Sequence, residues 1–148
     1  MFTYDILSTR KIRKKVRIKT PIDLHEYIKR YARSRQEYFL VISLNGAHDI
    51  IAIHISTIGL INKTIVHPRE VFKHVIKDEA AAIVVAHNHP SGNVRPSSED
   101  DDITKRLEEA AAILGINFLD HLIINKNSYY SYRQEKKLRD YTELSKSF

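Results

Sequence analysis

Residues 80–100 read AAAIVVAHNHPSGNVRPSSED, and this stretch decides how the chain folds. Its first part, Ala80–Ala86, is short and almost wholly apolar, which is typical of a strand buried on both faces of a sheet. A loop containing proline and glycine follows over residues 87–96. Ser97 can then cap a helix, with Asp100 three positions later in its first turn. The stretch therefore predicts a buried strand, a tight loop and a helix, in that order.

Strand and helix patterns continue on both sides of this stretch. Asn45-Gly46 lies between two β-rich runs and predicts a hairpin. Because helices interleave with strands and one strand pair is a hairpin, we expect an α/β fold in which helices sandwich a mixed β-sheet. Helices are expected from Thr20 to about Ser34, from His67 through Ile76 and from Ser97 to Leu114, and strands over Tyr38–Leu44, Asp49–Ile58, Ala80–Ala86, Asn117–Ile124 and Tyr129–Tyr132.

The length of 148 residues fits one domain that buries its own core. We divide the chain into a basic N-terminal segment over residues 1–19, a domain over residues 20–132, and a peripheral C-terminal helix or tail over residues 133–148. The last part is expected to be charged and helical.

Composition excludes several classes of protein. The absence of cysteine removes thiolate zinc sites, cysteine nucleophiles and disulfide frameworks. A transition-metal site must therefore be built from histidine, aspartate and glutamate, and the chain has eight histidines. No apolar run follows the basic N-terminal residues, and no stretch of 18 apolar residues occurs, so neither a secretory signal nor a membrane span is predicted. We expect a soluble protein of the cytoplasm.

The net charge of +6 is concentrated at the N-terminal end of the chain. Residues 1–35 hold 11 of the 24 basic residues and three of the 18 acidic ones. One interpretation is an arm that contacts nucleic acid phosphates. The other is a solvated edge strand whose charges discourage aggregation. Seven basic residues lie close together: Arg10, Lys11, Arg13, Lys14, Lys15, Arg17 and Lys19.

The pattern His87-Asn88-His89 suggests a metal site directly after the buried strand. Residues two apart on an extended strand project to the same side, so both imidazoles can aim at one point. The loop can fold back and bring Asp100 to that point. Two imidazoles and one carboxylate leave a fourth tetrahedral position for water, which is typical of a catalytic zinc. The alternative is two ordinary loop histidines and an aspartate that merely favours a helix start.

These residues belong to a longer stretch, residues 66–132, that closely resembles the RadC family. This family is a bacterial branch of the JAB/MPN (JAMM) metalloprotease-like fold, and weaker similarity extends back to about Thr20. The resemblance implies a JAB/MPN architecture of the cytidine-deaminase-like kind. It is carried by Val66-His67-Pro68-Arg69-Glu70-Val71-Phe72, His87-Asn88-His89-Pro90-Ser91-Gly92, Pro96-Ser97, Glu99-Asp100 and Leu119-Asp120-His121-Leu122-Ile123-Ile124.

The resemblance also implies a set of functional residues. The JAMM pattern is H-x-H, seven residues, Ser, two residues, Asp, and His87, His89, Ser97 and Asp100 meet every position. It implies one zinc ion per chain, held by the two histidines and the aspartate. The implied activity is hydrolysis of an amide, peptide or isopeptide-like bond by metal-activated water, in an unknown protein or peptide substrate.

Two catalytic roles follow from the same pattern. A glutamate upstream acts as general base, and Glu37, which opens an early strand, is our candidate; Glu70 and Glu99 are its competitors. Ser97 donates a hydrogen bond to the oxyanion in this pattern, but it can equally serve as a plain helix N-cap. Asp120, next to His121, is either a carboxylate that orients a ligating histidine or part of a buried hydrogen-bonded pair.

The family also has a traditional association with DNA repair. Its members often carry an N-terminal helix-hairpin-helix region for DNA, and we do not expect one in the short stretch before Thr20. The basic segment is the only local substitute. A nucleic-acid-associated protein, either a metal-dependent nuclease or a DNA-binding module, is therefore the alternative hypothesis. An exposed edge strand would support a homodimer.

Overall fold

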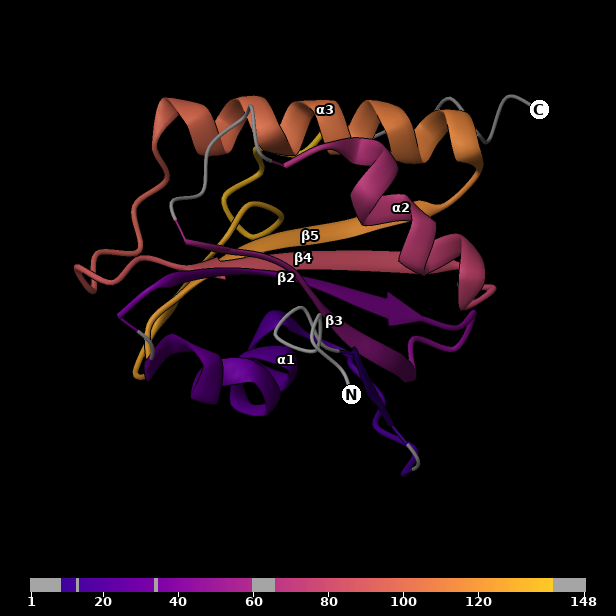
Figure 1. Cartoon of the computed structure of the whole chain (residues 1–148), viewed down its shortest axis with the longest axis horizontal. Coiled ribbons are helices and arrows are strands. Elements are labelled where there is room, and N and C mark those ends of the chain that lie inside the picture. Colours follow the sequence, from indigo (N-terminus) through magenta and orange to yellow (C-terminus); the bar gives the residue numbers. More distant parts are fainter. Residues whose placement is uncertain (1–8, 13, 34, 60–65, 140–148) are drawn as a thin grey trace.

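The structure is a computed structural model of the chain, and it describes residues 9–12, 14–33, 35–59 and 66–139. Over these residues the strands form one six-stranded sheet in the order β1-β3-β2-β4-β5-β6 (Figure 1). The elements are β1 (Thr9–Lys11), α1 (Pro21–Ile28) continued by a 3-10 helix (Lys29–Arg33), β2 (Glu37–Leu44), β3 (Ile50–Gly59), α2 (Pro68–Lys77), β4 (Ala82–Asn88), α3 (Ser98–Leu114), β5 (Asn117–Ile124) and β6 (Tyr129–Ser131).

The sheet is mixed, as predicted. Strand β2 pairs antiparallel with both β3 and β4, whereas β4 and β5 are parallel because α3 connects them across the sheet. Strand β4 lies inside the sheet and every one of its residues is buried, which explains the apolar run in the sequence. The strand also continues through Asn88, so His87 belongs to the strand and the loop begins at His89.

Helices cover both faces of the sheet, which confirms the predicted sandwich. Figure 1 shows α1 on one face and α2 with α3 on the other. Alternate residues of the central strands divide between the two cores because successive side chains of a strand point to opposite faces. Leu40, Ile42 and Val84 pack with Leu24 and Ile28 of α1. On the other face Phe39, Val41, Ile83 and Val85 pack with Val71 and Val75 of α2 and Ile103 and Leu107 of α3.

Helix α3 begins and ends as its sequence predicts. The Ser97 hydroxyl accepts a hydrogen bond from the Asp100 backbone N–H at 3.1 Å, and the Asp100 carboxylate accepts one from the Ser97 N–H at 2.8 Å. This reciprocal arrangement satisfies two N–H groups that have no partner inside the helix. Gly115 ends the helix at φ +71°, a left-handed conformation that favours glycine.

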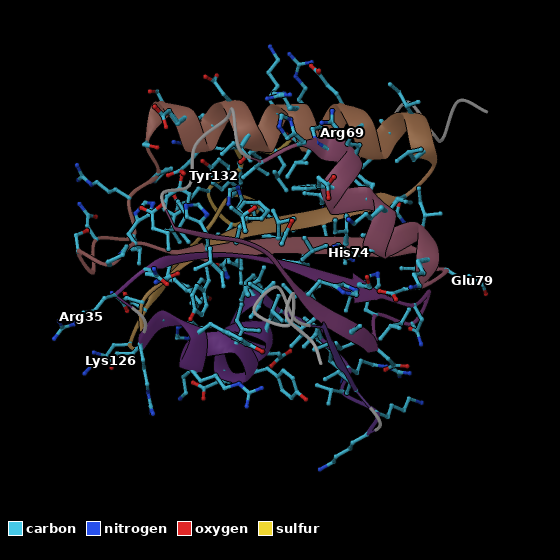
Figure 2. The ribbon with its side chains drawn as sticks, in the orientation of Figure 1. Arg35, Arg69, His74, Glu79, Lys126 and Tyr132 are labelled. Atoms are coloured by element: carbon cyan, nitrogen blue, oxygen red, sulfur yellow. The ribbon has the colours of Figure 1, made fainter. Side chains whose placement is uncertain are left out.

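Three expectations for the helices need correction. Helical spacing of apolar residues in the sequence predicts Ile76 and Leu114 on the buried faces of their helices, but they are 56% and 46% exposed. Residues 133–139 form turns where a helix was expected, and Lys136 adopts a positive φ of 56° that a helix cannot contain. The rest of that expected helix, residues 140–148, lies outside the described residues. Figure 2 shows Arg35 and Lys126 extending outward from the loops.

The basic N-terminal segment is described in part. Residues 9–11 form β1, which pairs with β3 at the edge of the sheet, as the edge-strand interpretation predicts. Lys14 and Lys15 are exposed, and Arg17 pairs with Asp49 at 3.1 Å. Residues 1–8 and 13 lie outside the described residues, and nucleic acid binding by this segment stays a prediction. Among the helices in the described ranges, none combines the length and apolar character that a bilayer crossing requires.

Candidate metal centre

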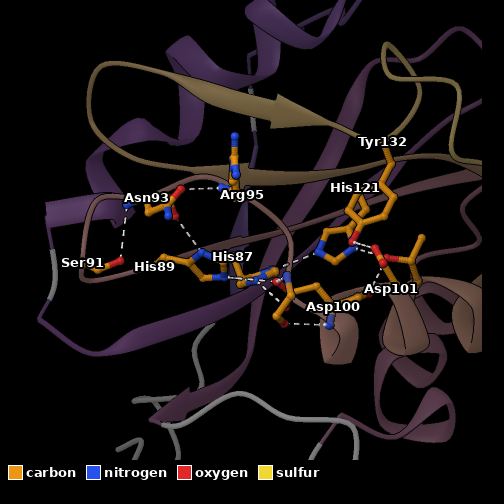
Figure 3. A network of polar contacts seen from close by, with 11 residues as sticks. His87, His89, Ser91, Asn93, Arg95, Asp100, Asp101, His121 and Tyr132 are labelled. Carbon is orange, nitrogen blue, oxygen red and sulfur yellow. Dashed lines mark hydrogen bonds and ion pairs between the residues drawn. The ribbon is translucent and has the colours of Figure 1, made fainter.

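The structure brings His87, His89 and Asp100 together at the end of β4. His87 Nε2 lies 3.0 Å from Asp100 Oδ1, and His89 Nε2 lies 3.2 Å from Asp100 Oδ2. The two Nε2 atoms are 3.1 Å apart. Figure 3 shows both rings directed at the carboxylate, which the first turn of α3 presents to them. The sequence spacing alone led us to expect this convergence.

The donor set fits a divalent metal ion. One ligand atom from each of the three residues lies within 4.8 Å of the others. Two ligands of a tetrahedral zinc ion, each bound at about 2.0–2.1 Å, lie roughly 3.3 Å apart. The observed separations of 3.0 to 3.2 Å are close to that value. Two imidazole nitrogens and a carboxylate are also the donors of many catalytic zinc sites.

Burial and charge act strongly on these groups. Burial alone would raise the pKa of Asp100, but the neighbouring imidazoles of His87 and His89 outweigh burial and hold that pKa far below its usual range. The hydrogen bond to Asp100 raises the pKa of His89, against the effect of burial, and the Glu37 carboxylate adds a smaller contribution in the same direction. The carboxylate is therefore ionised, as a metal ligand must be.

The ring of His89 is fixed by the loop that follows it. His89 Nδ1 lies 2.7 Å from the Asn93 carbonyl oxygen, which can only accept, so Nδ1 carries the hydrogen and Nε2 faces Asp100. The loop turns through Gly92, whose φ is +84° and whose N–H donates to the His89 carbonyl at 2.8 Å. The Asn125 side chain donates to the Gly92 carbonyl at 2.8 Å and ties this loop to the β5–β6 turn.

Two of the three residues, His89 and Asp100, line a small cleft. Its volume is about 430 Å³, and Glu37 lies in its wall beside His89 and Asp100. Pro90, Ser91, Ser97, Ser98 and Glu99 complete the lining. A larger cavity of about 940 Å³ lies along β5 and the C-terminal half of α3, and none of the candidate ligands lines it. The smaller cleft is therefore the one that matters for chemistry at this centre.

Antiparallel pairing explains why Glu37 reaches the cleft. Glu37 is the first residue of β2, and β2 runs antiparallel to β4, so the start of one strand lies beside the end of the other. Phe39 stands opposite His87 in this register. Of the competing acids, Glu99 also lines the cleft, whereas Glu70 does not and pairs with Lys73 at 2.9 Å on α2.

Ser97 combines two positions that the sequence left as alternatives. Its hydroxyl oxygen caps α3 by accepting from Asp100, and its side chain also lines the cleft. A hydroxyl that accepts one hydrogen bond can still donate its own hydrogen. The two roles proposed for Ser97 are therefore compatible.

Asp120 does not orient a ligating histidine. Its carboxylate accepts hydrogen bonds from the Ser131 hydroxyl, from the His121 N–H at 2.8 Å and from the Arg133 N–H at 2.9 Å. The next residue, His121, contacts the site instead, with Nε2 at 2.9 Å from His87 Nδ1. Neighbouring residues of a strand face opposite sides of the sheet, so only one of this pair can face the site. In the parallel pairing His121 stands beside Val85, on the His87 side.

Thr104 was missed altogether by the sequence reasoning. It lies one turn after Asp100 in α3, and its hydroxyl is 2.5 Å from His121 Nδ1. The spacing of four residues after a candidate ligand, on the same helix face, is the signal that would have found it.

Comparison with known proteins agrees with the resemblance to the RadC family. A family model described as RadC-like JAB domain matches residues 18–138. The chain is 48% identical over 123 residues to a UPF0758 protein of Alkaliphilus metalliredigens, covering 82% of this chain and 53% of that protein. It is 56% identical over 98 residues to a UPF0758 protein of Methanospirillum hungatei, covering 66% of this chain and 44% of that protein. The chain thus spans about half the length of the curated relatives it matches.

Proposed function

The chain belongs to the RadC-like JAB domain family, and from this premise and the geometry of its metal centre we propose that it is a zinc-dependent hydrolase of an amide, peptide or isopeptide-like bond. The observation that carries the proposal is the mutual spacing of His87 Nε2, His89 Nε2 and the Asp100 carboxylate beside an open cleft. Since the chain spans about half of its relatives, the activity of the whole protein is part of the proposal.

In this proposal His87, His89 and Asp100 would hold the zinc ion. The bound ion would lower the pKa of water and polarise a substrate carbonyl. Glu37, in the wall of the same cleft, accepts the proton that the attacking water loses and delivers it to the leaving nitrogen. This role requires a carboxylate within reach of the water, and Glu37 and Glu99 are the glutamates that line the cleft.

Ser97 stabilises the negative charge that develops on the substrate oxygen. Its hydroxyl oxygen is held by the Asp100 N–H, so its hydrogen is available to the substrate from a fixed position. A donor fixed in advance costs no reorganisation when the charge develops, and such a donor contributes about 2–4 kcal/mol in comparable sites.

The test is hydrolysis by zinc-loaded protein and its Glu37→Gln variant. The probes are a fluorogenic peptide library and a peptide with a Lys-linked isopeptide bond. We expect cleavage by the wild-type protein and a loss of about 10²-fold or more in the variant, which keeps its zinc. Glu99→Gln is the matched control and should retain activity. Wild-type rates in Glu37→Gln, or cleavage that persists in a strong chelator, would refute the proposal.

The same protein samples distinguish this proposal from the alternative, a metal-dependent nuclease. A metal-dependent nuclease would cut supercoiled plasmid DNA and leave the peptide probes intact. The exposed Lys14 and Lys15 favour contact with phosphates. DNA cleavage that depends on Asp100 would favour this alternative over peptide hydrolysis.

A further inference from the structure

We propose that His121 and Thr104 are positioning residues that fix the ring and the tautomer of His87, so that its Nε2 lone pair faces the metal position before any metal binds. This inference rests on the proposed metal site but concerns a different property. It assigns a direction to every hydrogen bond in a buried row of side chains that runs from His87 through His121 and Thr104 to the backbone of Asp100.

The direction of these hydrogen bonds is set at the end of the row that lies farthest from His87. The Thr104 hydroxyl lies 2.7 Å from the Asp100 backbone carbonyl oxygen. A carbonyl oxygen cannot donate, so the single hydroxyl hydrogen of Thr104 points to Asp100. Thr104 Oγ1 must then accept in its contact with His121 Nδ1, at 2.5 Å, which means that His121 carries its hydrogen on Nδ1.

The same logic passes through the ring of His121 to His87. A neutral imidazole has one donor and one acceptor nitrogen, so His121 Nε2 accepts. Its partner at 2.9 Å, His87 Nδ1, must donate. The lone pair of neutral His87 is therefore on Nε2, the atom that faces Asp100 and His89. Metal-bound histidines usually donate their other ring N–H to a neighbouring group in this way.

Packing excludes water from this row of hydrogen bonds and holds the rings in place. His121 has no exposed surface, and His87 and Thr104 are 1% and 2% exposed. The Tyr132 ring stacks on His121 at 4.9 Å with an interplanar angle of 7°, and Phe39 stacks on His87 at 6.0 Å with an angle of 17°. The Tyr132 hydroxyl donates to Asp101 at 2.7 Å, which anchors it to α3. Figure 3 shows His121 between His87 and Tyr132.

Asp100 takes part at both ends of this row of hydrogen bonds, through two different groups. Its carboxylate is a candidate metal ligand, and its backbone carbonyl terminates the row that orients His87. A shift of the first turn of α3 would therefore disturb two ligands together. Neighbours that orient a ligating histidine contribute about 10–100-fold in metal affinity.

The first test is zinc affinity, measured by competition with a chromophoric chelator. His121→Phe keeps an aromatic ring but removes the acceptor, and should bind zinc about 10–100-fold more weakly. Thr104→Val, which keeps the shape and removes the hydroxyl, should also weaken binding, whereas Thr104→Ser restores the hydroxyl and should stay close to the wild-type protein. Wild-type affinity in both Thr104→Val and His121→Phe would overturn the proposal.

The second test needs neither metal nor mutation. Nitrogen-15 NMR of the imidazoles in the metal-free wild-type protein should show His121 protonated on Nδ1 and bare on Nε2. A proton on His121 Nε2 would overturn the proposal even if zinc binds. Conversely, a wild-type protein that binds no zinc but shows the expected His121 tautomer would defeat the proposed function and leave the assigned hydrogen bonds standing.

Discussion

Asn88 holds the backbone on both sides of Glu37. Its side-chain oxygen accepts a hydrogen bond from the Tyr38 N–H at 2.7 Å, and its side-chain nitrogen donates to the Gln36 carbonyl at 2.9 Å. Asn88 lies between His87 and His89 in the sequence and is 1% exposed. The residue between the two candidate ligands therefore fixes the position of the candidate general base.

Replacing Asn88 by alanine should destabilise the fold and slow hydrolysis. The Tyr38 N–H and the Gln36 carbonyl would lose their partners in a partly buried place, which costs about 0.5–1.5 kcal/mol for each hydrogen bond. Denaturant unfolding of the metal-free protein measures this. Equal stability of Asn88→Ala and the wild-type protein would show that the two hydrogen bonds of Asn88 contribute nothing.

Ser97→Ala should lower stability by about 1 kcal/mol. The substitution removes the hydroxyl that caps the Asp100 N–H, and N-cap residues contribute about this much. Ser98→Ala is the matched control, because Ser98 is an exposed neighbour in the same cleft and should change stability little. Thermal unfolding of the three proteins at one pH compares them. A loss as large in Ser98→Ala would contradict the assigned cap.

His74 should make the protein less stable in mild acid. Burial, helped by the neighbouring His54 ring at 4.4 Å, lowers the pKa of His74 to about 4, below its ordinary 6.5. Between these pH values the unfolded chain binds the proton and the folded one does not, so stability falls as pH drops from about 6.5 to about 4. Because His74 is only half-buried, we expect a loss of about 1 kcal/mol from this group.

Denaturant midpoints across this pH range check the prediction. His74→Gln cannot take up the proton and should show a flatter profile between pH 6.5 and pH 4. His54 also contacts Asp78 at 2.6 Å, a pair that the substitution leaves in place. An unchanged profile in His74→Gln would mean that another group carries the acid sensitivity.

Gly115→Ala should destabilise the protein by about 1 kcal/mol through the backbone alone. An added Cβ would meet no atom within 4 Å, but φ is +71°, which alanine adopts at a cost of about 1–2 kcal/mol. Gly46 also has open space around its Cβ position and no positive φ, so Gly46→Ala is the control and should change stability little. Equal unfolding midpoints for the two variants would contradict this reading.

Local patterns predicted much of this molecule because local physics determines it. The buried run of β4, the two-residue spacing of His87 and His89, and the cap that sets Asp100 on α3 all act within 20 residues of chain. Their convergence needs only strand parity and one helix start. The family pattern supplied the candidate role for Glu37.

The remaining parts of the site depend on strand register, which the sequence does not display. His121 reaches His87 because β4 and β5 pair in parallel with Val85 beside His121. Without that register, the Asp120 carboxylate was one of two alternatives for orienting a ligating histidine, although it bonds to Ser131 and Arg133 on the other face. The prediction of a C-terminal helix was wrong over residues 133–139. Backbone N–H groups there donate to the carboxylates of Asp120 and Glu108 and hold the segment in a non-helical path.

Zinc stoichiometry of the purified chain is the most direct test of the metal centre. We predict about one zinc ion per chain in the wild-type protein after equilibration with zinc and removal of the excess. Elemental analysis should find that ion lost in His87→Ala and in Asp100→Asn, each of which removes one donor of the group. A wild-type protein that retains no zinc, or variants that retain as much as the wild type, would contradict the account.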